Sequence, residues 1–227
     1  MESDMKQFLI ALLCVLLLIH LIPVGSEAAC EQPKANKRIV LTFDDGPHPK
    51  QTIQILDFLD RYGIKATFFM IGVNVSNYPQ VANEVVARGH EVGNHTTTHS
   101  HAIRMDDALL IREIDECEKA VWAHTGKHCK LFRPPEGALT DHMRATIKQM
   151  GYVNVLWTLD TRDWAHTPPN EISDYIIQNA KNGDIILMHD YIGANSPTLK
   201  ALEIFIPILL EQGFTFVTAG ELIESKQ

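Results

Sequence analysis

From Arg38 onward, short apolar segments alternate with longer amphipathic ones, and this alternation restricts the fold more than any other feature of the chain. Short apolar runs predict buried strands, whereas apolar residues at helical spacing predict helices. The predicted strands are residues 38–43, 66–72, 91–95, 130–135, 152–160, 184–190 and 214–220. The predicted helices between them are residues 51–63, 78–89, 105–126, 141–151, 170–183 and 197–213.

Repeated strand–helix units with nearly continuous apolar strands are typical of a parallel sheet that is buried on both faces. About seven such units favour a closed or nearly closed barrel over an open doubly wound sheet. The Gly-x-Gly-x-x-Gly pattern of a dinucleotide site does not follow the first strand. The sequence therefore predicts an α/β chain with a distorted (β/α) barrel, forming one domain over residues 38–223.

The N-terminal segment, residues 1–28, is predicted to be a signal peptide or an N-terminal membrane anchor. Phe8–Val24 is almost uninterrupted in its apolar character, and Ser26-Glu27-Ala28 resembles a signal-peptidase site. Lipid attachment at Cys30 is a minor alternative. Residues 29–37 are predicted to be a short polar lead-in. We therefore expect an exported protein that remains tethered to the membrane if the leader is not cleaved.

The net charge argues against one class of partner, and the cysteines allow two alternative structural roles. The chain has 20 basic and 28 acidic residues, for a net charge of −8, whereas nucleic-acid binding relies on basic surfaces. No nucleic-acid partner is expected. Cys117 and Cys129 are either disulfide-bonded or two buried free thiols, and the sequence leaves both alternatives open.

Polar residues stand where most of the predicted strands end. In parallel (β/α) barrels, active sites lie at the carboxyl ends of the strands. The residues at these ends are Asp44, Asp45, Asn94, His95, Arg133, Asp160, His189 and Asp190. The second strand is the exception, because it is predicted to end in Ile71-Gly72-Val73. The sequence therefore predicts acids, imidazoles and an arginine along one rim.

Two of these motifs predict a metal site. In LTFDDGPHP, residues 41–49, two adjacent carboxylates end an apolar strand, where they repel each other unless a cation lies between them. In HTTTH, His95 and His99 have the spacing that places two rings on one face of a helical turn. A turn at the acids and an exposed histidine pair are the alternatives. Asp45, His95 and His99 are predicted to hold a divalent ion, with Asp44 left free beside it.

Several residues outside these motifs are expected to have structural roles. Trp122 and Trp157 are predicted to fill the core. Five histidines are predicted to lie on the surface: His48, His101, His124, His128 and His142.

Five motifs in this order carry a family resemblance: TFDDGP, HTTTH, RPPEG, DTRDW and ILMH. Over roughly Arg38–Leu222 they resemble the NodB-homology polysaccharide deacetylases of carbohydrate esterase family 4. The resemblance implies a distorted barrel and metal-dependent removal of N- or O-acetyl groups from sugars. It also assigns the ion to Asp45, His95 and His99, with zinc expected and cobalt, nickel and manganese as alternatives.

The same resemblance implies further roles. Asp44 is expected to be the general base, oriented by Arg133, and His189 the general acid, tuned by Asp163. The residues expected to contact substrate are Pro135, Glu136, Trp164 and Leu187. Leu187 helps to form the acetyl-methyl pocket, and the Glu136 backbone N–H belongs to the oxyanion hole. The chain departs from the family pattern at Ser100, where proline is usual, and at Glu136, where an aromatic residue is usual.

The activity expected from the resemblance is that of a hydrolase acting on carbon–nitrogen, non-peptide bonds. Its substrate would be an N-acetylglucosamine-containing polysaccharide, either peptidoglycan or a chitin-like polymer, and its location the cell wall or the secreted fraction. An O-deacetylase of acetylxylan is one alternative. A non-catalytic glycan-binding protein on the same fold is another.

Overall fold

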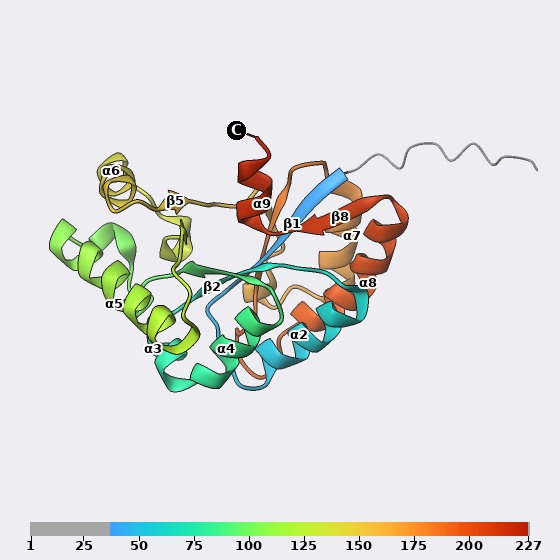
Figure 1. Ribbon diagram of the computed structural model, residues 1–227. Coiled ribbons are helices and arrows are strands. Elements are labelled where there is room, and N and C mark those ends of the chain that lie inside the picture. The colour runs from blue at the N-terminus through green and yellow to red at the C-terminus, as the bar shows by residue number, and fades with distance from the viewer. Residues whose placement is uncertain (1–36, 227) are drawn as a thin grey trace, which may run out of the picture. The chain divides into compact units, whose positions relative to one another are not determined.

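The computed structural model describes residues 37–226 (Figure 1), so the predictions for residues 1–28 and Cys30 lie outside the described residues. Its centre is β1 (Lys37–Asp44), which is buried and lies between two neighbouring parallel strands. The order of strands is β5-β4-β3-β2-β1-β7-β6, and β8 also pairs with β1. The strands after β1 are β2 (Thr67–Met70), β3 (Glu91–Asn94), β4 (Leu131–Phe132), β5 (Val153–Asn154), β6 (Leu159–Asp160), β7 (Ile185–His189) and β8 (Phe214–Val217).

All strand pairs are parallel, and helices connect most of them, which confirms the predicted (β/α) architecture. The helices are α2 (Gln51–Tyr62), α3 (Gly72–Asn77), α4 (Pro79–Ala87), α5 (Asp107–Thr125), α6 (Asp141–Gln149), α7 (Pro169–Asn179), α8 (Thr198–Glu211) and α9 (Ala219–Glu224). Three short 3₁₀ turns are η2 (Ala102–Arg104), η3 (Pro135–Gly137) and η4 (Asp163–Ala165). The six predicted helices are confirmed within a few residues at each end.

The core lies between the sheet and the helices that cover it. Ile39, Leu41 and Phe43 of β1 are fully buried and pack in one cluster with Leu56 and Leu59 of α2. The helix α2 ends at Gly63, whose φ of 63° allows the left-handed conformation that closes a helix. Burial of both faces of β1 explains why its sequence is a continuous apolar run.

The second strand is shorter than predicted. It ends at Met70, and residues 72–77 form α3. The N–H groups of Gly72 and Val73 donate to the carbonyls of Thr96 and Thr97, so they are not available for a strand ladder. The helix α9 was also not predicted. It begins with a capping box, in which Thr218 and Glu221 exchange hydrogen bonds with each other's backbone N–H.

The prediction of one strand over residues 152–160 is wrong. The segment forms two short strands at opposite ends of the sheet, with β5 paired to β4 and β6 paired to β7. Within residues 37–226 no ladder joins β5 to β6, so the barrel is not closed. In the connecting residues, the Val155 and Leu156 carbonyls accept hydrogen bonds from the Arg133 guanidinium. The Arg133 side chain thus donates the hydrogen bonds that a neighbouring strand would otherwise supply to these carbonyls.

The structure distinguishes the two alternatives for the cysteines. Cys117 and Cys129 are both buried, and neither is disulfide-bonded. Burial raises the pKa of the Cys117 thiol to about 12 and also raises the pKa of Cys129. Both thiols therefore stay protonated and have a packing role.

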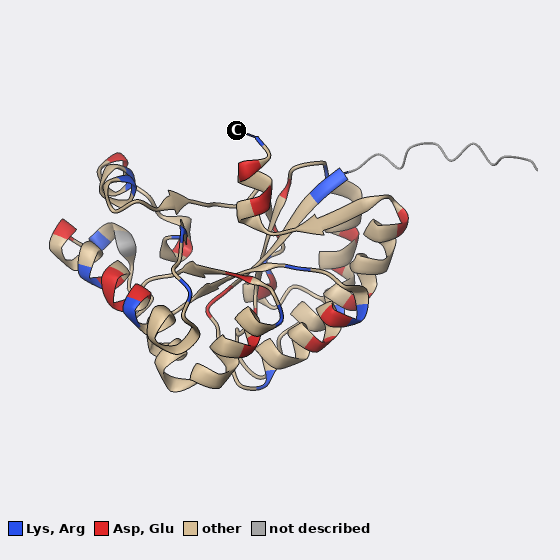
Figure 2. Ribbon diagram, viewed as in Figure 1, with Lys and Arg blue, Asp and Glu red and all other residues tan. Residues whose placement is uncertain are grey.

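The surface of the described chain is mixed in charge. Figure 2 shows acidic and basic residues interspersed over the outer helices. Among the residues that the structure describes, no helix has the length and apolar character needed to cross a membrane.

Candidate metal and active site

Five of the eight polar residues predicted at the strand ends line one cavity of about 450 Å³, whereas Asn94, Arg133 and Asp190 do not line it. Its lining comes from the carboxyl-terminal residues of β1, β6 and β7 and from the segments that follow β1, β3, β4, β5 and β6. The lining residues are Asp44, Asp45, His95, His99, Glu136, Trp157, Asp160, Trp164, Leu187 and His189. Because all the strands run parallel, their carboxyl ends meet at this one edge, as expected for a barrel.

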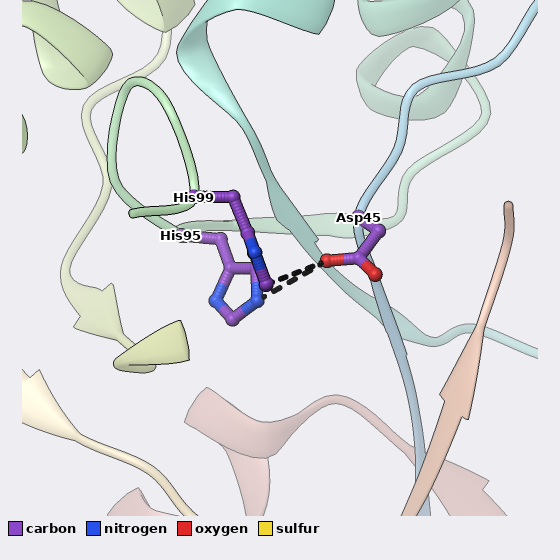
Figure 3. A group of neighbouring side chains, drawn as sticks. All are labelled: Asp45, His95 and His99. Atoms are coloured by element: carbon purple, nitrogen blue, oxygen red, sulfur yellow. Dashed lines mark ion pairs between the residues drawn. The ribbon is translucent and has the colours of Figure 1, made fainter. Parts of the chain in front are cut away.

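Asp45, His95 and His99 line this cavity and point toward one another (Figure 3). The Asp45 Oδ1 atom is 3.4 Å from His95 Nε2 and 3.2 Å from His99 Nε2. One ligand atom from each residue can be chosen so that all three lie within 4.8 Å of one another. Asp45 and His99 both have positive φ, of 76° and 56°, a conformation that non-glycine residues rarely adopt. Such backbone geometry is concentrated at functional sites.

This cluster fits a divalent cation. Asp45 Oδ1 is buried and has no hydrogen-bond partner among the described residues, and a buried carboxylate is costly unless it is paired or coordinates a metal. The His95 Nδ1–H donates to the Arg133 carbonyl over 2.7 Å, which leaves Nε2 facing Asp45. Two imidazole nitrogens and a carboxylate oxygen make up a three-ligand set that leaves one coordination position open.

The electrostatics of the cluster couple metal binding to proton release. Burial raises the pKa of Asp45, but His95 and the other nearby imidazoles lower it more, so its pKa lies below the usual value. Burial lowers the pKa of His95, yet Asp44 and Asp45 together shift that pKa above its usual value. A cation at this position would compete with a proton for His95, so metal affinity should increase with pH.

Asp44 lies beside this cluster and is held by a buried arginine. Arg133 is fully buried, and its Nη1 donates to Asp44 Oδ1 over 2.7 Å and to Thr42 Oγ1 over 2.8 Å. The guanidinium lies over the Phe69 ring at 4.1 Å. The other oxygen, Asp44 Oδ2, is 3.8 Å from His95 Nε2. One carboxylate oxygen is thus fixed by Arg133, and the other faces the metal-ligand cluster.

His189 lines the same cavity and is held by Asp163. The His189 Nδ1 donates to Asp163 Oδ1 over 2.8 Å, and the His189 backbone N–H donates to Oδ2 over 2.8 Å. The fully buried Asp163 also accepts from the Trp164 N–H and the Thr198 hydroxyl. Burial lowers the pKa of His189, but Asp163, followed by Asp44 and Asp45, raises it to about 9. The imidazole is therefore protonated at neutral pH.

Three of the four residues predicted to contact substrate line the cavity. They are Glu136, Trp164 and Leu187, and the Trp164 side chain is 49% exposed. Pro135 is buried at the start of η3 and is not among the lining residues. The Glu136 carboxylate forms an ion pair with His101 at 2.9 Å. In residues 37–226 no acceptor is bonded to the Glu136 backbone N–H.

The two tryptophans predicted to fill the core do not do so. Trp122 is 53% exposed on α5. Trp157 lines the cavity and lies so close to Gly137 that a Cβ at that glycine would come within 2.5 Å of the ring. The sequence pattern did not reveal Trp157 because its segment was predicted to be a continuous strand.

Two further residues support the site from outside the cavity. Thr198 carries no local sequence signal, because it is 35 positions from Asp163, to which its hydroxyl donates over 2.7 Å. Asp190 was predicted to be on the rim, but it does not line the cavity; it is buried and accepts from Thr52 Oγ1. A Cβ at Gly46 would lie 2.0 Å from the Asp190 carboxylate, so the glycine of the DDGP motif is required by close packing.

Comparisons with known proteins agree on one family. The family model described as "Polysaccharide deacetylase" matches residues 31–155. A Bacillus cereus peptidoglycan-N-acetylglucosamine deacetylase is 42% identical over 200 residues, covering 86% of this chain and 92% of that protein. The structure of the peptidoglycan deacetylase PdaC from Bacillus subtilis is 35% identical, with a TM-score of 0.78 and coverage of 85% and 93%. This chain spans only 40% of full-length PdaC.

A third similar protein carries a metal. The structure of a family 4 acetyl xylan esterase from Clostridium thermocellum, in complex with a cobalt ion, is 33% identical to this chain. Its TM-score is 0.79, and the match covers 84% of this chain and 92% of that one.

Proposed function

Because this chain belongs to the polysaccharide deacetylase family, we propose that it is a metal-dependent hydrolase that removes N-acetyl groups from N-acetylglucosamine-containing glycans. The observation that carries the proposal is one cavity that holds the Asp45–His95–His99 cluster together with Asp44 and His189. We assign the activity to residues 38–223 and propose peptidoglycan as the substrate, since the Bacillus cereus relative is named for it. The corresponding location is the cell wall, after export.

We propose that Asp45, His95 and His99 hold the ion, most simply zinc. When bound, such an ion supplies Lewis acidity toward the acetyl carbonyl and lowers the pKa of water. Asp44 accepts the proton of the attacking water, because Arg133 holds its Oδ1 and leaves Oδ2 facing the cluster. Proton transfer of this kind contributes about 10²–10⁴ in rate.

The remaining roles concern the acetyl group and the leaving nitrogen. The free Glu136 N–H donates to the acetyl oxygen as negative charge develops there. Leu187 contacts the acetyl methyl, and the half-exposed Trp164 forms a wall of the groove. His189 is protonated and gives its proton to the sugar nitrogen as the C–N bond breaks. Asp163 keeps the ring in position through Nδ1.

Acetate release from N-acetylglucosamine tetramers and from peptidoglycan, with and without a chelator, tests this function. The expected result is release that a chelator abolishes and that added zinc or cobalt restores. Release from acetylxylan alone would support the O-deacetylase alternative. Glycan binding without release, whichever metal is added, would support a non-catalytic binding protein.

The pH dependence of the reaction tests the role of Asp163. His189 donates a proton, so activity should fall as pH rises through the pKa of His189. Because Asp163 raises that pKa, Asp163→Asn should move the alkaline limb of kcat/KM to lower pH by about 1–3 units. A pH–rate profile of the two proteins measures the shift. An unchanged alkaline limb would show that another group is the acid.

A further inference from the structure

A second cavity, of about 380 Å³, lies between the start of α2 and the segment that leads into α8. Its lining residues include His48, Lys50, Gln51, Tyr191, Ser196 and Lys200. His48 follows Asp45 by three positions, and Tyr191 follows His189 by two. Both segments leave the carboxyl ends of central strands, so this cavity is on the same rim as the catalytic one. Thr198 lines it too and donates to Asp163, which in turn accepts from His189 of the catalytic cavity.

The two lysines give this cavity a positive charge in an acidic protein. Throughout residues 37–226, neither Lys50 nor Lys200 has a carboxylate within ion-pair distance. The backbone does not supply the charge, because the first N–H groups of α2 are already bonded. The Lys50 and Gln51 N–H groups both donate to His48 Nδ1, at 3.3 and 3.2 Å. An anion in this cavity would therefore be recognised by the ammonium groups.

The rest of the lining suits a sugar. His48, predicted to be on the surface, is partly buried and stacks on Tyr191 with the ring centroids 4.1 Å apart and an interplanar angle of 9°. Burial, and then Lys50, lowers the pKa of His48, so the ring is neutral. Tyr191 is 40% exposed, and its side chain combines an apolar ring with a polar tip. The buried Gln51 Oε1 has no partner among the described residues and can accept from a hydroxyl or amide.

We infer that this cavity is an accessory subsite for a carboxylate-bearing sugar of the same glycan strand, with Lys50 and Lys200 binding the carboxylate. The inference rests on the proposed function and makes it more specific. In peptidoglycan the carboxylate is either the lactyl group of the muramic acid or part of the stem peptide, whereas chitin has none. The subsite would thus favour peptidoglycan over neutral polymers of the same sugar.

The variant Lys50→Gln/Lys200→Gln tests this subsite. The charge-matched control carries Lys119→Gln and Lys148→Gln together, at two exposed lysines on α5 and α6. Three oligomers of equal length are compared: chitotetraose, a peptidoglycan tetrasaccharide without stem peptides, and the same tetrasaccharide with them. We expect the double variant to raise KM for the peptidoglycan oligomers about tenfold without changing kcat, and to leave KM for chitotetraose within about twofold. Added salt should weaken binding of the peptidoglycan oligomers to the wild type more than to the double variant.

The two peptidoglycan oligomers identify the source of the carboxylate. The lactyl carboxyl is free only in the oligomer without stem peptides, because the peptide is attached to it through an amide bond. An effect on that oligomer alone assigns the lactyl group, and an effect on the peptide-bearing oligomer alone assigns the stem peptide. An effect on both shows that the two lysines bind either carboxylate. Equal KM changes for chitotetraose and both peptidoglycan oligomers, or no change for any, would overturn the subsite while acetate release stands. Calorimetry measures binding of the oligomers independently of catalysis. If the anionic oligomers bind more tightly in a lysine-dependent way but no acetate is released from any oligomer, the proposed deacetylase activity is wrong and the subsite stands.

Discussion

Replacement of His95 by alanine is expected to abolish metal uptake and to reduce acetate release by more than about 10⁴-fold, beyond the effect of one proton-transfer group. His95 is buried, and its Nδ1 is bonded to the Arg133 carbonyl, so no other side chain can take its place. Its loss leaves Asp45 and His99 as a two-ligand set. Because the ion acts on both water and the acetyl carbonyl, losing it removes both effects together.

Metal content by plasma mass spectrometry and acetate release by an enzymatic assay measure the two effects. His142→Ala is a suitable control, since His142 is exposed, lies outside the cavity, and within residues 37–226 forms its one ion pair with Asp107. The control should keep metal and activity. A His95→Ala protein that retains one ion per chain would contradict the proposed ligand set.

The substitution Asp44→Asn is expected to keep the ion and to lower kcat by about 10²–10⁴-fold. Asparagine has nearly the same shape and can still accept from Arg133 Nη1, but it cannot take a proton from water. The variant also leaves the buried Arg133 without its counter-ion, and removal of one partner from a buried pair costs about 3–5 kcal/mol. Assays should therefore be run well below the melting temperature of the variant.

The two substitutions are most informative together. His95→Ala should lose both metal and activity, and Asp44→Asn should lose activity alone. Equal loss of metal in both variants would mean that Asp44 is also a ligand. The base would then have to be another group.

Local sequence pattern predicted most of the fold because strands buried on both faces must be apolar along their whole length. It was wrong where contacts between distant segments decide the structure. The break within residues 152–160 depends on Arg133, which bonds the carbonyls of Val155 and Leu156. The end of the second strand depends on the Thr96 and Thr97 carbonyls, which accept from residues that follow Met70.

The site was predictable to the extent that its residues stand in short motifs at strand ends. The predicted metal ligands and His189 line one cavity, as do three of the four predicted substrate contacts. Thr198 was missed because it supports the site through Asp163, 35 positions away in the sequence. Asp190 was predicted to be on the rim, but its buried hydrogen bond with the distant Thr52 was not predicted. A pattern of residue types along one segment carries no information about such partners.

The gap between β5 and β6 has a consequence for protein engineering. The Arg133 guanidinium donates to carbonyls in this gap and also to Asp44, the proposed general base. Residue 133 therefore contributes both to folding and to turnover. Random substitution of residue 133 is therefore expected to lower the fraction of folded clones and the fraction of active clones together. Substitutions intended to change the glycan specificity are better placed at Glu136 and Trp164. The side chains of both residues are about half exposed to solvent and make fewer buried contacts than Arg133.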